Sequence, residues 1–364
     1  MSEERDILAA RKAKMQSWQA AVGAYPNDFR RQDLAADLLA RHIEDDKAAL
    51  AEVQVATAVA GRIMLRRVMG KASFITLQDV SGQIQCYLAK DNLSEEAYAG
   101  FTQHWEMGDI VGVRGVLMRT NKGELSVQAQ EIVLLNKTLQ PLPEKFHGLT
   151  DQETRYRQRY VDLMTNADSR NVFQARSQIV HNLRQYFVGH DYLEVETPMM
   201  HGIPGGATAR PFITHHNALD MPLYLRVAPE LFLKRLVVGG FERVFEINRN
   251  FRNEGLSTRH NPEFTMLEFY QAYADYEDLM SLTDEMLAML ATNVRGSAKF
   301  SYQGIELDLG KPALRVSMEE SLVRFGGVAE TAADNEADLR DLLERSGATL
   351  QDGWGLGKLQ MEMF

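Results

Sequence analysis

The chain has 364 residues, 45% of them hydrophobic and 25% charged, which is typical of a globular protein with two or more domains. No apolar run approaches the ~20 residues that cross a bilayer, and the N-terminus lacks the apolar segment of a signal peptide, so we expect a cytoplasmic protein without membrane contact. The single cysteine, Cys86, excludes an internal disulfide, and no Cys/His cluster marks a zinc site. The net charge of -10 argues against a protein that coats nucleic acid through bulk positive potential.

The N-terminal segment is rich in Ala, Leu and charged residues, with a break at Tyr25-Pro26-Asn27-Asp28. Such a composition favours helices, and the break contains a proline and turn-forming residues. We therefore predict a helical extension in two pieces over residues 1–52.

Residues 53–140 contain five strand-like runs rich in Val, Ile and Leu, with glycines in several of the turns between them. The runs cover residues 53–65, 73–80, 82–89, 109–118 and 124–135. A helical segment of about three turns, 94–105, separates the third run from the fourth. Five strands with a helix after the third are the layout of an OB-fold β-barrel, in which the face formed by strands two and three binds single-stranded nucleic acid.

A basic stretch lies at the first turn of this predicted barrel. Residues 61–71 contain no acidic residue and four basic ones, Arg62, Arg66, Arg67 and Lys71. Such a stretch fits either a nucleic-acid contact or a strand edge protected by charges. The layout also places Phe74 on strand two and Gln85 on strand three, beside Arg67. A ring, an amide and a guanidinium suit the recognition of unpaired bases, whereas alternation alone equally allows Phe74 to lie in the core.

Residues 141–167 are rich in proline and charge and are the predicted linker to a second domain, 168–364. That domain opens with a predicted helix that ends at Gly189, followed by a strand-like run over 192–200. The glycines of the loop 202–212 let the backbone approach a ligand closely, although a plain loop is equally compatible with them. A short strand and a helix follow, with Pro229 in the first turn of the helix and Glu230 beside it. Glu230 is either a ligand contact or simply a favourable charge at the helix N-terminus.

The segment 241–270 contains two strand-like arms joined by a polar turn at 253–262. In the second arm the alternate residues Phe264, Met266, Glu268 and Tyr270 fall on one face. A phosphate needs a planar cation, an adenine needs a flat ring and an ammonium needs a carboxylate, and Arg252, Phe264 and Glu268 are side chains of these types. The alternative is an ordinary amphipathic hairpin with a solvated, charged face.

The strings FRNE and HNPEF in this segment resemble motif 2 of the class II aminoacyl-tRNA synthetases. The preceding helix, strand and Pro198 are similar to motif 1 of that class, which forms a dimer interface. Lysyl-, aspartyl- and asparaginyl-tRNA synthetases also carry an N-terminal OB-fold that grips the anticodon, and RRVMGKASFITLQDVSGQIQ looks like that face in the lysine enzymes. Where aspartate and asparagine enzymes typically have Gln-Ser-Pro-Gln, this chain has Val227-Ala228-Pro229-Glu230, which matches the lysine type.

The resemblance implies an ATP-dependent lysine–tRNA ligase of protein biosynthesis, which forms lysyl-adenylate and transfers lysine to tRNA(Lys). It also implies Mg2+ as the cofactor that accompanies ATP, and a homodimer formed through motif 1. It assigns Arg252 to catalysis. For ATP it implies Arg252, Glu254, His260, Asn261 and Phe264. For lysine it implies Gly206, Glu230, Glu268 and Tyr270. For the anticodon it implies Arg67, Phe74 and Gln85, with Glu124 as a further candidate.

The third motif of the class, a strand and helix with Gly-x-Gly-x-x-Arg, has no match in these residues. The nearest string, Gly353 to Lys358, lacks the Arg, and we interpret it as a turn. The expected fold is therefore α+β, an OB-fold barrel followed by an incomplete class II antiparallel sheet with flanking helices. We expect a C-terminally truncated chain that lacks the magnesium ligands and has impaired activity alone. Two alternatives remain, a non-catalytic tRNA-binding protein that uses its OB-fold, and a synthetase-like lysine transferase acting on a translation factor, although that family normally lacks the OB-fold.

Overall fold

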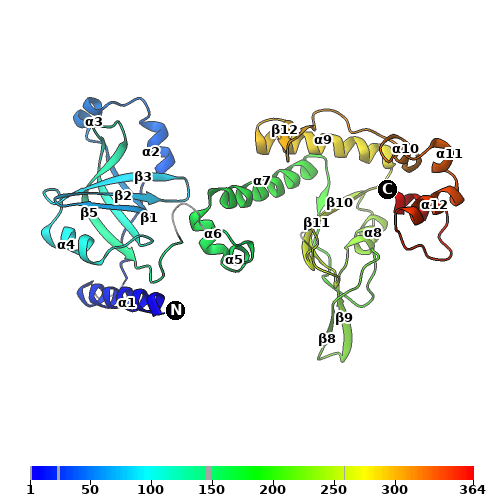
Figure 1. The fold of residues 1–364 in the computed structure, drawn as a ribbon, viewed down its shortest axis with the longest axis horizontal. Helices are drawn as coiled ribbons and strands as arrows, with labels where there is room; N and C mark the ends of the chain where they lie inside the picture. The colour runs from blue at the N-terminus through cyan, green and yellow to red at the C-terminus, as the bar shows by residue number, and fades with distance from the viewer. Residues whose placement is uncertain (1, 23–24, 144–148, 258) are drawn as a thin grey trace. The chain divides into compact units, whose positions relative to one another are not determined.

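The computed structural model describes residues 2–22, 25–143, 149–257 and 259–364. Its contacts divide the chain into two compact units, Met1–Arg170 and Asn171–Phe364 (Figure 1). Part of the expected linker, residues 144–148, and Thr258 of the expected polar turn lie outside the described residues. The domain boundaries after residues 52, 140 and 167 stay predictions.

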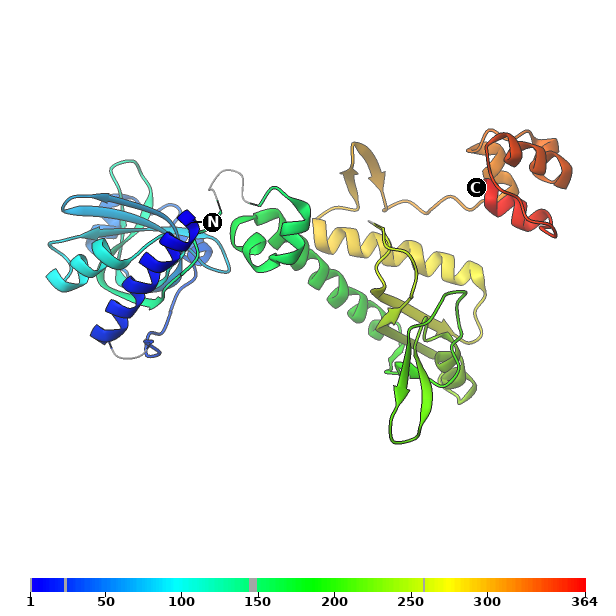
Figure 2. The same ribbon diagram turned by 60° about the horizontal axis from the view of Figure 1, so that its bottom comes forward.

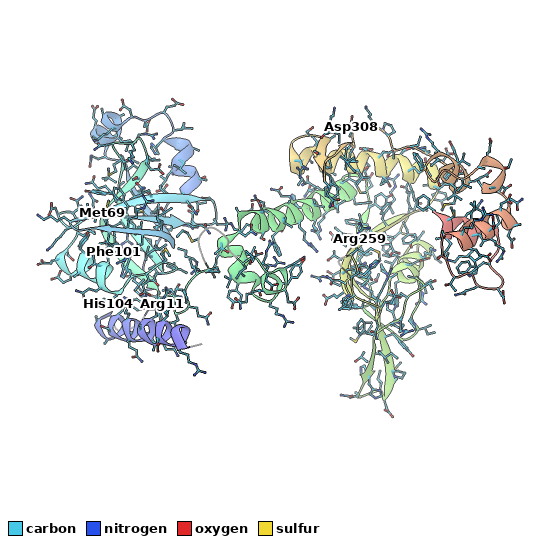
Figure 3. All side chains as sticks on the ribbon, in the orientation of Figure 1. Arg11, Met69, Phe101, His104, Arg259 and Asp308 are labelled. Atoms are coloured by element: carbon cyan, nitrogen blue, oxygen red, sulfur yellow. The ribbon has the colours of Figure 1, made fainter. Side chains whose placement is uncertain are left out.

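The first unit is built on a closed β-barrel with the strand order β1-β2-β3-β5-β4. Its strands are β1 (Ala56–Met69), β2 (Ala72–Gln78), β3 (Gln83–Ala89), β4 (Ile110–Arg119) and β5 (Leu125–Asn136). Helix α4 (Glu95–His104) lies between β3 and β4, as the sequence predicts for an OB-fold. Because side chains alternate along a strand, Ile75 and Leu77 of β2 enter the barrel core, where Phe101 of α4 is fully buried (Figure 3).

The N-terminal segment contains three helices in the described residues and not the predicted two, namely α1 (Ser2–Val22), α2 (Ala35–Arg41) and α3 (Lys47–Val53). Residues 25–34 are not helical, and the backbone N–H groups of Gln32 and Asp33 donate to the carbonyl oxygen of Ala58 in β1. Asp46 caps α3 by accepting a hydrogen bond from Ala49, which starts a new helix where the sequence suggested a continuous one. Trp18, Leu38 and Leu50 are buried in the same core as the barrel.

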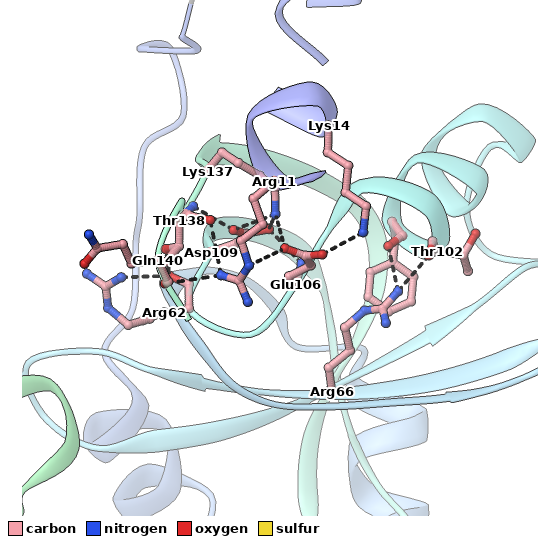
Figure 4. A network of polar contacts seen from close by, with 12 residues as sticks. Arg11, Lys14, Arg62, Arg66, Thr102, Glu106, Asp109, Lys137, Thr138 and Gln140 are labelled. Carbon is pink, nitrogen blue, oxygen red and sulfur yellow. Dashed lines mark hydrogen bonds and ion pairs between the residues drawn. The ribbon is translucent and has the colours of Figure 1, made fainter. Parts of the chain in front are cut away.

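A partly buried charge network joins α1 to the barrel (Figure 4). Glu106 forms ion pairs with Arg11 at 2.9 Å and with Lys14 at 2.6 Å, both on α1. Lys137 at the end of β5 pairs with Glu106 at 3.2 Å and with the fully buried Asp109 at 2.8 Å. The N-terminal helix is thereby tied to the barrel by charges that would be costly to leave unpaired.

Two short helices, α5 (Gln152–Arg157) and α6 (Arg159–Thr165), lie within the predicted linker. They share a buried carboxylate, because Asp162 accepts hydrogen bonds from Arg155 at 2.9 Å and from Arg159 at 2.6 Å. Burial raises the pKa of Asp162, but side-chain hydrogen bonds with Ser169, Arg155 and Arg159 outweigh it and lower the pKa to about 2. The described part of the linker after residue 148 is therefore locally ordered and not a plain connection.

The described residues of the second unit form three small sheets, with helices around them. One sheet has the order β11-β10-β6, with β6 (Leu193–Glu194), β10 (Arg243–Phe251) and β11 (Glu263–Gln271). The second has the order β7-β9-β8, with β7 (Met200–His201), β8 (Ile213–His216) and β9 (Met221–Leu225). The third is the hairpin of β12 (Lys299–Tyr302) and β13 (Ile305–Asp308).

Two long helices cover the core of the β10–β11 sheet, α7 (Ala167–Gly189) and α9 (Tyr276–Arg295) (Figure 2). Phe187 of α7 stacks on Phe245 of β10, with ring centroids 5.1 Å apart, and Met286 of α9 joins the same cluster. The Tyr186 hydroxyl donates to the Leu282 carbonyl at 3.2 Å, which links the two helices directly. The helix predicted up to Gly189 is confirmed.

The strand predicted over 192–200 is wrong in its middle. Only Leu193 and Glu194 form β6, which pairs with β10 in parallel, and the next strand, β7, begins at Met200. Pro198 has no N–H to donate to a ladder, and the intervening residues connect two different sheets.

The last part of the chain forms four short helices, α10 (Met318–Arg324), α11 (Glu330–Ala333), α12 (Glu336–Arg345) and α13 (Leu356–Met363). They bury their own cluster, in which Leu322, Leu339 and Leu359 are almost fully covered. Gly353 has φ +91° in the turn that precedes α13, in agreement with the interpretation of this string as a turn. Within the described parts of the chain, no helix is both long and apolar enough to cross a membrane.

Candidate functional site

The candidate site is built on the antiparallel β10–β11 hairpin. Its register pairs Glu246 with Glu268, Asn248 with Met266 and Asn250 with Phe264. Directly opposed residues share a face, so the alternation predicted for β11 continues across β10. The shared face has a ring at one end and two carboxylates toward the other.

Arg252 follows the last residue of β10, and its N–H still donates to the Pro262 carbonyl at 2.8 Å. The carbon at the centre of its guanidinium lies 5.1 Å from the centroid of the Phe264 ring. Its Nε is buried and has no hydrogen-bond partner within the described residues. A cation is therefore held over an aromatic ring with hydrogen-bonding capacity left over, which is an arrangement suited to a phosphate beside a planar base.

The turn between the strands contacts the glycine-rich loop that precedes β8. The Asn253 N–H donates to the Arg210 carbonyl at 2.7 Å, and the Arg210 N–H donates to the Glu254 carboxylate at 3.3 Å. An open cavity of about 490 Å³ lies at this junction, lined by Thr208, Ala209, Arg210, Asn253, Glu254 and Gly255. Glu254 is thus placed at a hollow beside Arg252.

His260 and Asn261 lie on the exposed side of this turn. His260 is fixed locally, because its Nδ1 lies 2.8 Å from the Ser257 hydroxyl and its N–H donates to the same oxygen at 3.1 Å. Asn261 is exposed, and Arg259 projects from the same turn (Figure 3). The sequence-predicted nucleotide residues are therefore neighbours along one turn, which leads from the hollow to Phe264.

A second cluster combines the predicted lysine-binding residues. A Cβ added to Gly206 would lie 3.0 Å from the Cβ of Glu230, so the glycine lets the loop pass directly over the start of α8 (Glu230–Val238). The Tyr270 hydroxyl donates to the Glu268 carboxylate at 2.7 Å. Lys234, one turn along α8, donates to the Glu230 carboxylate at 2.6 Å, and its ammonium nitrogen lies 5.6 Å from the centroid of the Tyr270 ring.

The electrostatics of this cluster favour a cation. Burial raises the pKa of Glu268, the charges of Glu230 and Glu246 raise it further, and the Tyr270 hydrogen bond and Lys234 oppose them. Burial and the hydrogen bond to Glu268 also raise the pKa of Tyr270. Glu230 and Glu246 are already paired with Lys234 and Arg226, whereas Glu268 is hydrogen-bonded only by the Tyr270 phenol within the described residues, so an added ammonium group would stabilise the Glu268 carboxylate.

Sequence reasoning missed the groups that support this cluster. Arg226, at the end of β9, pairs with Glu246 at 2.8 Å, and both side chains are almost fully buried. Arg226 also donates to the Thr197 carbonyl at 3.1 Å, while the Thr197 hydroxyl donates to Glu246 at 2.6 Å. Glu246 is thus held in place beside Glu268 on the same face, a position that follows from the cross-strand register. Lys234 could have been noticed from its i,i+4 spacing to Glu230.

The barrel carries the other predicted set. Arg67 lies directly opposite Phe74 in the β1–β2 ladder, and Thr76 lies opposite Gln85 in the β2–β3 ladder. Phe74 is half-buried on the outer face, whereas its neighbours Ser73 and Ile75 are fully buried, so the core alternative for Phe74 is wrong. The Ser126 hydroxyl donates to the Gln85 side-chain oxygen at 3.0 Å and lies 3.4 Å from the carbonyl oxygen of Glu124. The four predicted residues therefore gather on or beside one face.

Two members of the basic stretch have structural roles. Arg62 donates to the Gly108 carbonyl at 2.7 Å. Arg66 donates to the carbonyl oxygens of Phe101 and Thr102 near the end of α4, and burial lowers the pKa of both arginines. Only Arg67 and Lys71 of the four are exposed. The basic surface is therefore smaller than the sequence suggested.

Family models match both units of this structure. The model described as class II tRNA synthetases (D, K and N) matches residues 151–350, and the model of the OB-fold nucleic acid binding domain matches residues 57–135. The chain is a class II tRNA synthetase that carries an OB-fold domain on the N-terminal side of its synthetase domain.

Curated relatives narrow the class. The lysine–tRNA ligase of Idiomarina loihiensis is 57% identical over 360 residues, which cover 98% of this chain and 71% of the relative. The lysine–tRNA ligases of Laribacter hongkongensis and Dechloromonas aromatica are 56% and 55% identical, over 100% of this chain and 72% of each relative. The chain belongs to the lysine–tRNA ligase family, a family of aminoacyl-tRNA synthetases, and the resemblance noted in the sequence is confirmed.

Proposed function

We propose that this chain provides the binding surfaces for ATP, lysine and tRNA(Lys) in the two-step charging of tRNA with lysine. The observation that carries the proposal is the single face of the β10–β11 hairpin, where Arg252 lies over Phe264 and Glu268 and Tyr270 follow on the same strand. A nucleotide and an amino acid bound along this face would lie side by side.

The chemistry requires positioning and charge neutralisation and no side-chain nucleophile. A lysine carboxylate oxygen attacks the α-phosphorus of ATP, the bond from that phosphorus to the bridging oxygen of the β-phosphate breaks, and pyrophosphate leaves. A ribose hydroxyl of the terminal adenosine of tRNA then attacks the carbonyl carbon, AMP leaves with the bonding electrons, and the hydroxyl proton passes to the departing phosphate or to solvent. The carboxylate is already ionised near neutral pH, so in-line placement is what the protein must supply.

Each proposed nucleotide residue has a distinct task. Arg252 neutralises charge that develops on the α-phosphate, and Phe264 stacks on the adenine. Glu254, His260 and Asn261 line the turn that would seat the remainder of the nucleotide. The buried Nε of Arg252, without a partner among the described residues, supports its role as a ligand donor.

The proposed lysine contacts are the carboxylates of Glu230 and Glu268, with the Tyr270 phenol and the Gly206 backbone beside them. Glu230 would hold the α-amino group, and Glu268 with Tyr270 would recognise the substrate's amines. The position of Lys234 supports this assignment, because its own ammonium group lies between the Glu230 carboxylate and the Tyr270 ring. The side chains of this cluster are therefore compatible with a bound ammonium group.

We propose Mg2+ as the ion that accompanies the ATP phosphates. Across the described residues, no group of three or more His, Cys, Asp or Glu side chains could hold a metal. Hard oxygen ligands such as phosphates are what Mg2+ prefers, so it would enter with the nucleotide.

We also propose that the OB-fold binds the anticodon through Arg67, Phe74, Gln85 and Glu124, and that the enzyme acts in the cytoplasm as a homodimer. Exposed apolar side chains on α7 support the dimer, since Val172 is 65% and Ile179 is 38% exposed. Sedimentation of the chain and of a Val172→Arg variant tests this assembly, which is contradicted if both have the mass of one chain.

ATP binding by calorimetry tests the nucleotide site. Arg252→Gln and Phe264→Ala should each weaken binding at least about tenfold, equivalent to about 1.4 kcal/mol. Arg249→Gln is the matched control, because Arg249 is an exposed residue of the same hairpin that pairs with Glu263 at 2.8 Å. Equal losses in all three variants would contradict the site. Lysine-dependent exchange of pyrophosphate into ATP then tests the reaction.

A further inference from the structure

One row of side chains crosses the outer face of the barrel at right angles to its strands. Arg67 of β1 lies opposite Phe74 of β2, Phe74 lies opposite Tyr87 of β3, and Tyr87 lies opposite Gln128 of β5. Directly opposed residues point to the same side of a sheet. The row therefore has the order cation, ring, ring, amide, and only its first two members belong to the proposed anticodon set.

Tyr87 belongs to the outer surface and not to the core. It is half-buried, whereas its neighbours Cys86 and Leu88 are completely buried on the inner side. Its ring centroid lies 5.1 Å from that of Phe74, with the ring planes 45° apart. Within the described residues its hydroxyl makes no hydrogen bond, and it is not among the buried polar atoms, so it is open to a ligand.

We propose that Tyr87 is a second base-stacking residue and that Gln128 reads the edge of the same base, so that the RNA-binding surface continues from β2 across β3 to β5. The inference rests on the proposed binding of tRNA by the barrel. One ring can stack on one base, and a second ring one strand away offers a platform for the neighbouring unpaired nucleotide. The phenol and the carboxamide both donate and accept, which suits a base edge better than a phosphate.

A labelled RNA hairpin with the lysine anticodon loop, titrated with the full chain at fixed salt, tests the proposal by fluorescence anisotropy. Tyr87→Ala should raise Kd about tenfold, Tyr87→Phe should raise it less because the ring remains, and Gln128→Ala should raise it about threefold. Tyr302→Ala is the matched control, because Tyr302 is 59% exposed on the β12–β13 hairpin. Circular dichroism identifies any variant that fails to fold, and Tyr87→Leu then replaces Tyr87→Ala because it retains apolar cover without a ring.

Abasic substitutions in the loop separate direct stacking from mere support of Phe74. If Tyr87 stacks on its own base, one abasic position should lose its effect in Tyr87→Ala, and a different position should lose its effect in Phe74→Ala. The proposal is overturned if both variants are insensitive to the same position, or if Tyr87→Ala binds like the unaltered chain. Absence of binding by the unaltered chain would instead overturn the proposed function of the barrel.

Discussion

At the scale of single residues, the carboxylates around Glu268 lead to a prediction about how stability depends on pH. Burial and two neighbouring carboxylates raise the pKa of Glu268 in the folded chain above its ordinary value of 4.5. The folded state then binds this proton more tightly than the unfolded state, so the charged carboxylate destabilises the fold above the raised pKa. That destabilisation is relieved as the pH falls through the raised pKa toward 4.5.

Glu268→Gln should therefore stabilise the second unit at neutral pH and remove the part of the pH dependence that Glu268 contributes. Urea unfolding at several values between pH 4.5 and 7.5 measures the effect. Glu263→Gln is a matched control on the same strand, because Glu263 is exposed and pairs with Arg249. An identical pH dependence of the unfolding free energy in the two variants would show that burial and the neighbouring carboxylates do not raise the pKa of Glu268.

A second residue-scale prediction concerns the orientation of Gln85. The Ser126 hydroxyl is buried and donates to the Gln85 side-chain oxygen, which leaves the amide NH2 group facing outward as a donor. Ser126→Ala should reduce the free energy of unfolding by about 0.5–1.5 kcal/mol and relax the preference for a base with an acceptor over one with a donor. Anisotropy with uracil and cytosine exchanged at each loop position measures that preference.

Ser73→Ala is the control for this prediction. Ser73 is equally buried in the barrel but lies 2.9 Å from the Tyr98 hydroxyl on the inner side. The Ser73→Ala change should cause a similar loss of stability without changing the preference between uracil and cytosine. If both variants relax the preference, general loosening of the barrel and not Gln85 orientation would be the cause.

At the scale of elements, the loop before β8 depends on one glycine. Gly206 has φ +90°, and an added Cβ would meet the Cβ atoms of Glu230 at 3.0 Å and Ala228 at 3.3 Å. Gly206→Ala should destabilise the second unit by about 1–3 kcal/mol, because both the backbone conformation and the space exclude a side chain. Gly202→Ala is the control, since Gly202 lies in the same loop and a Cβ there would meet nothing within 4 Å. Equal unfolding midpoints for the two variants would contradict the requirement for glycine at position 206.

How far the sequence predicts each element depends on whether its pattern is local. Period-two alternation was sufficient to place Phe264, Glu268 and Tyr270 on one face, and the five barrel strands and α4 follow from similar local patterns. Alternation could not decide whether Phe74 points inward, because that depends on which face the rest of the barrel covers. Glu246 and Arg226 escaped prediction for the same reason, since their roles follow from strand register and from a buried pair 20 residues apart in sequence.

At the scale of the whole molecule, the two units have separate hydrophobic cores. Trp18 and Trp105 are buried in the core of the first unit, and Trp354 packs against the helical cluster near the end of the second. A ligand that binds one folded unit stabilises that unit alone, unless the two unfold together. The proposed RNA site lies wholly in the first unit, so the two units should respond differently to RNA.

The anticodon hairpin at 100 times its Kd should stabilise the first unit by about 2.7 kcal/mol and leave the second unchanged. Tryptophan fluorescence of a Trp354→Phe variant follows the first unit, because only Trp18 and Trp105 then remain. Circular dichroism follows the urea unfolding of both units. RNA should move the transition of the first unit, which coincides with the fluorescence change, to higher urea and leave the transition of the second unit where it is. If RNA shifted the unfolding of both units equally, the two units on either side of the Arg170–Asn171 boundary would unfold as one cooperative unit. A hairpin with an altered loop is the control, because it retains the phosphate charge and loses the bases that the row from Arg67 to Gln128 is proposed to read.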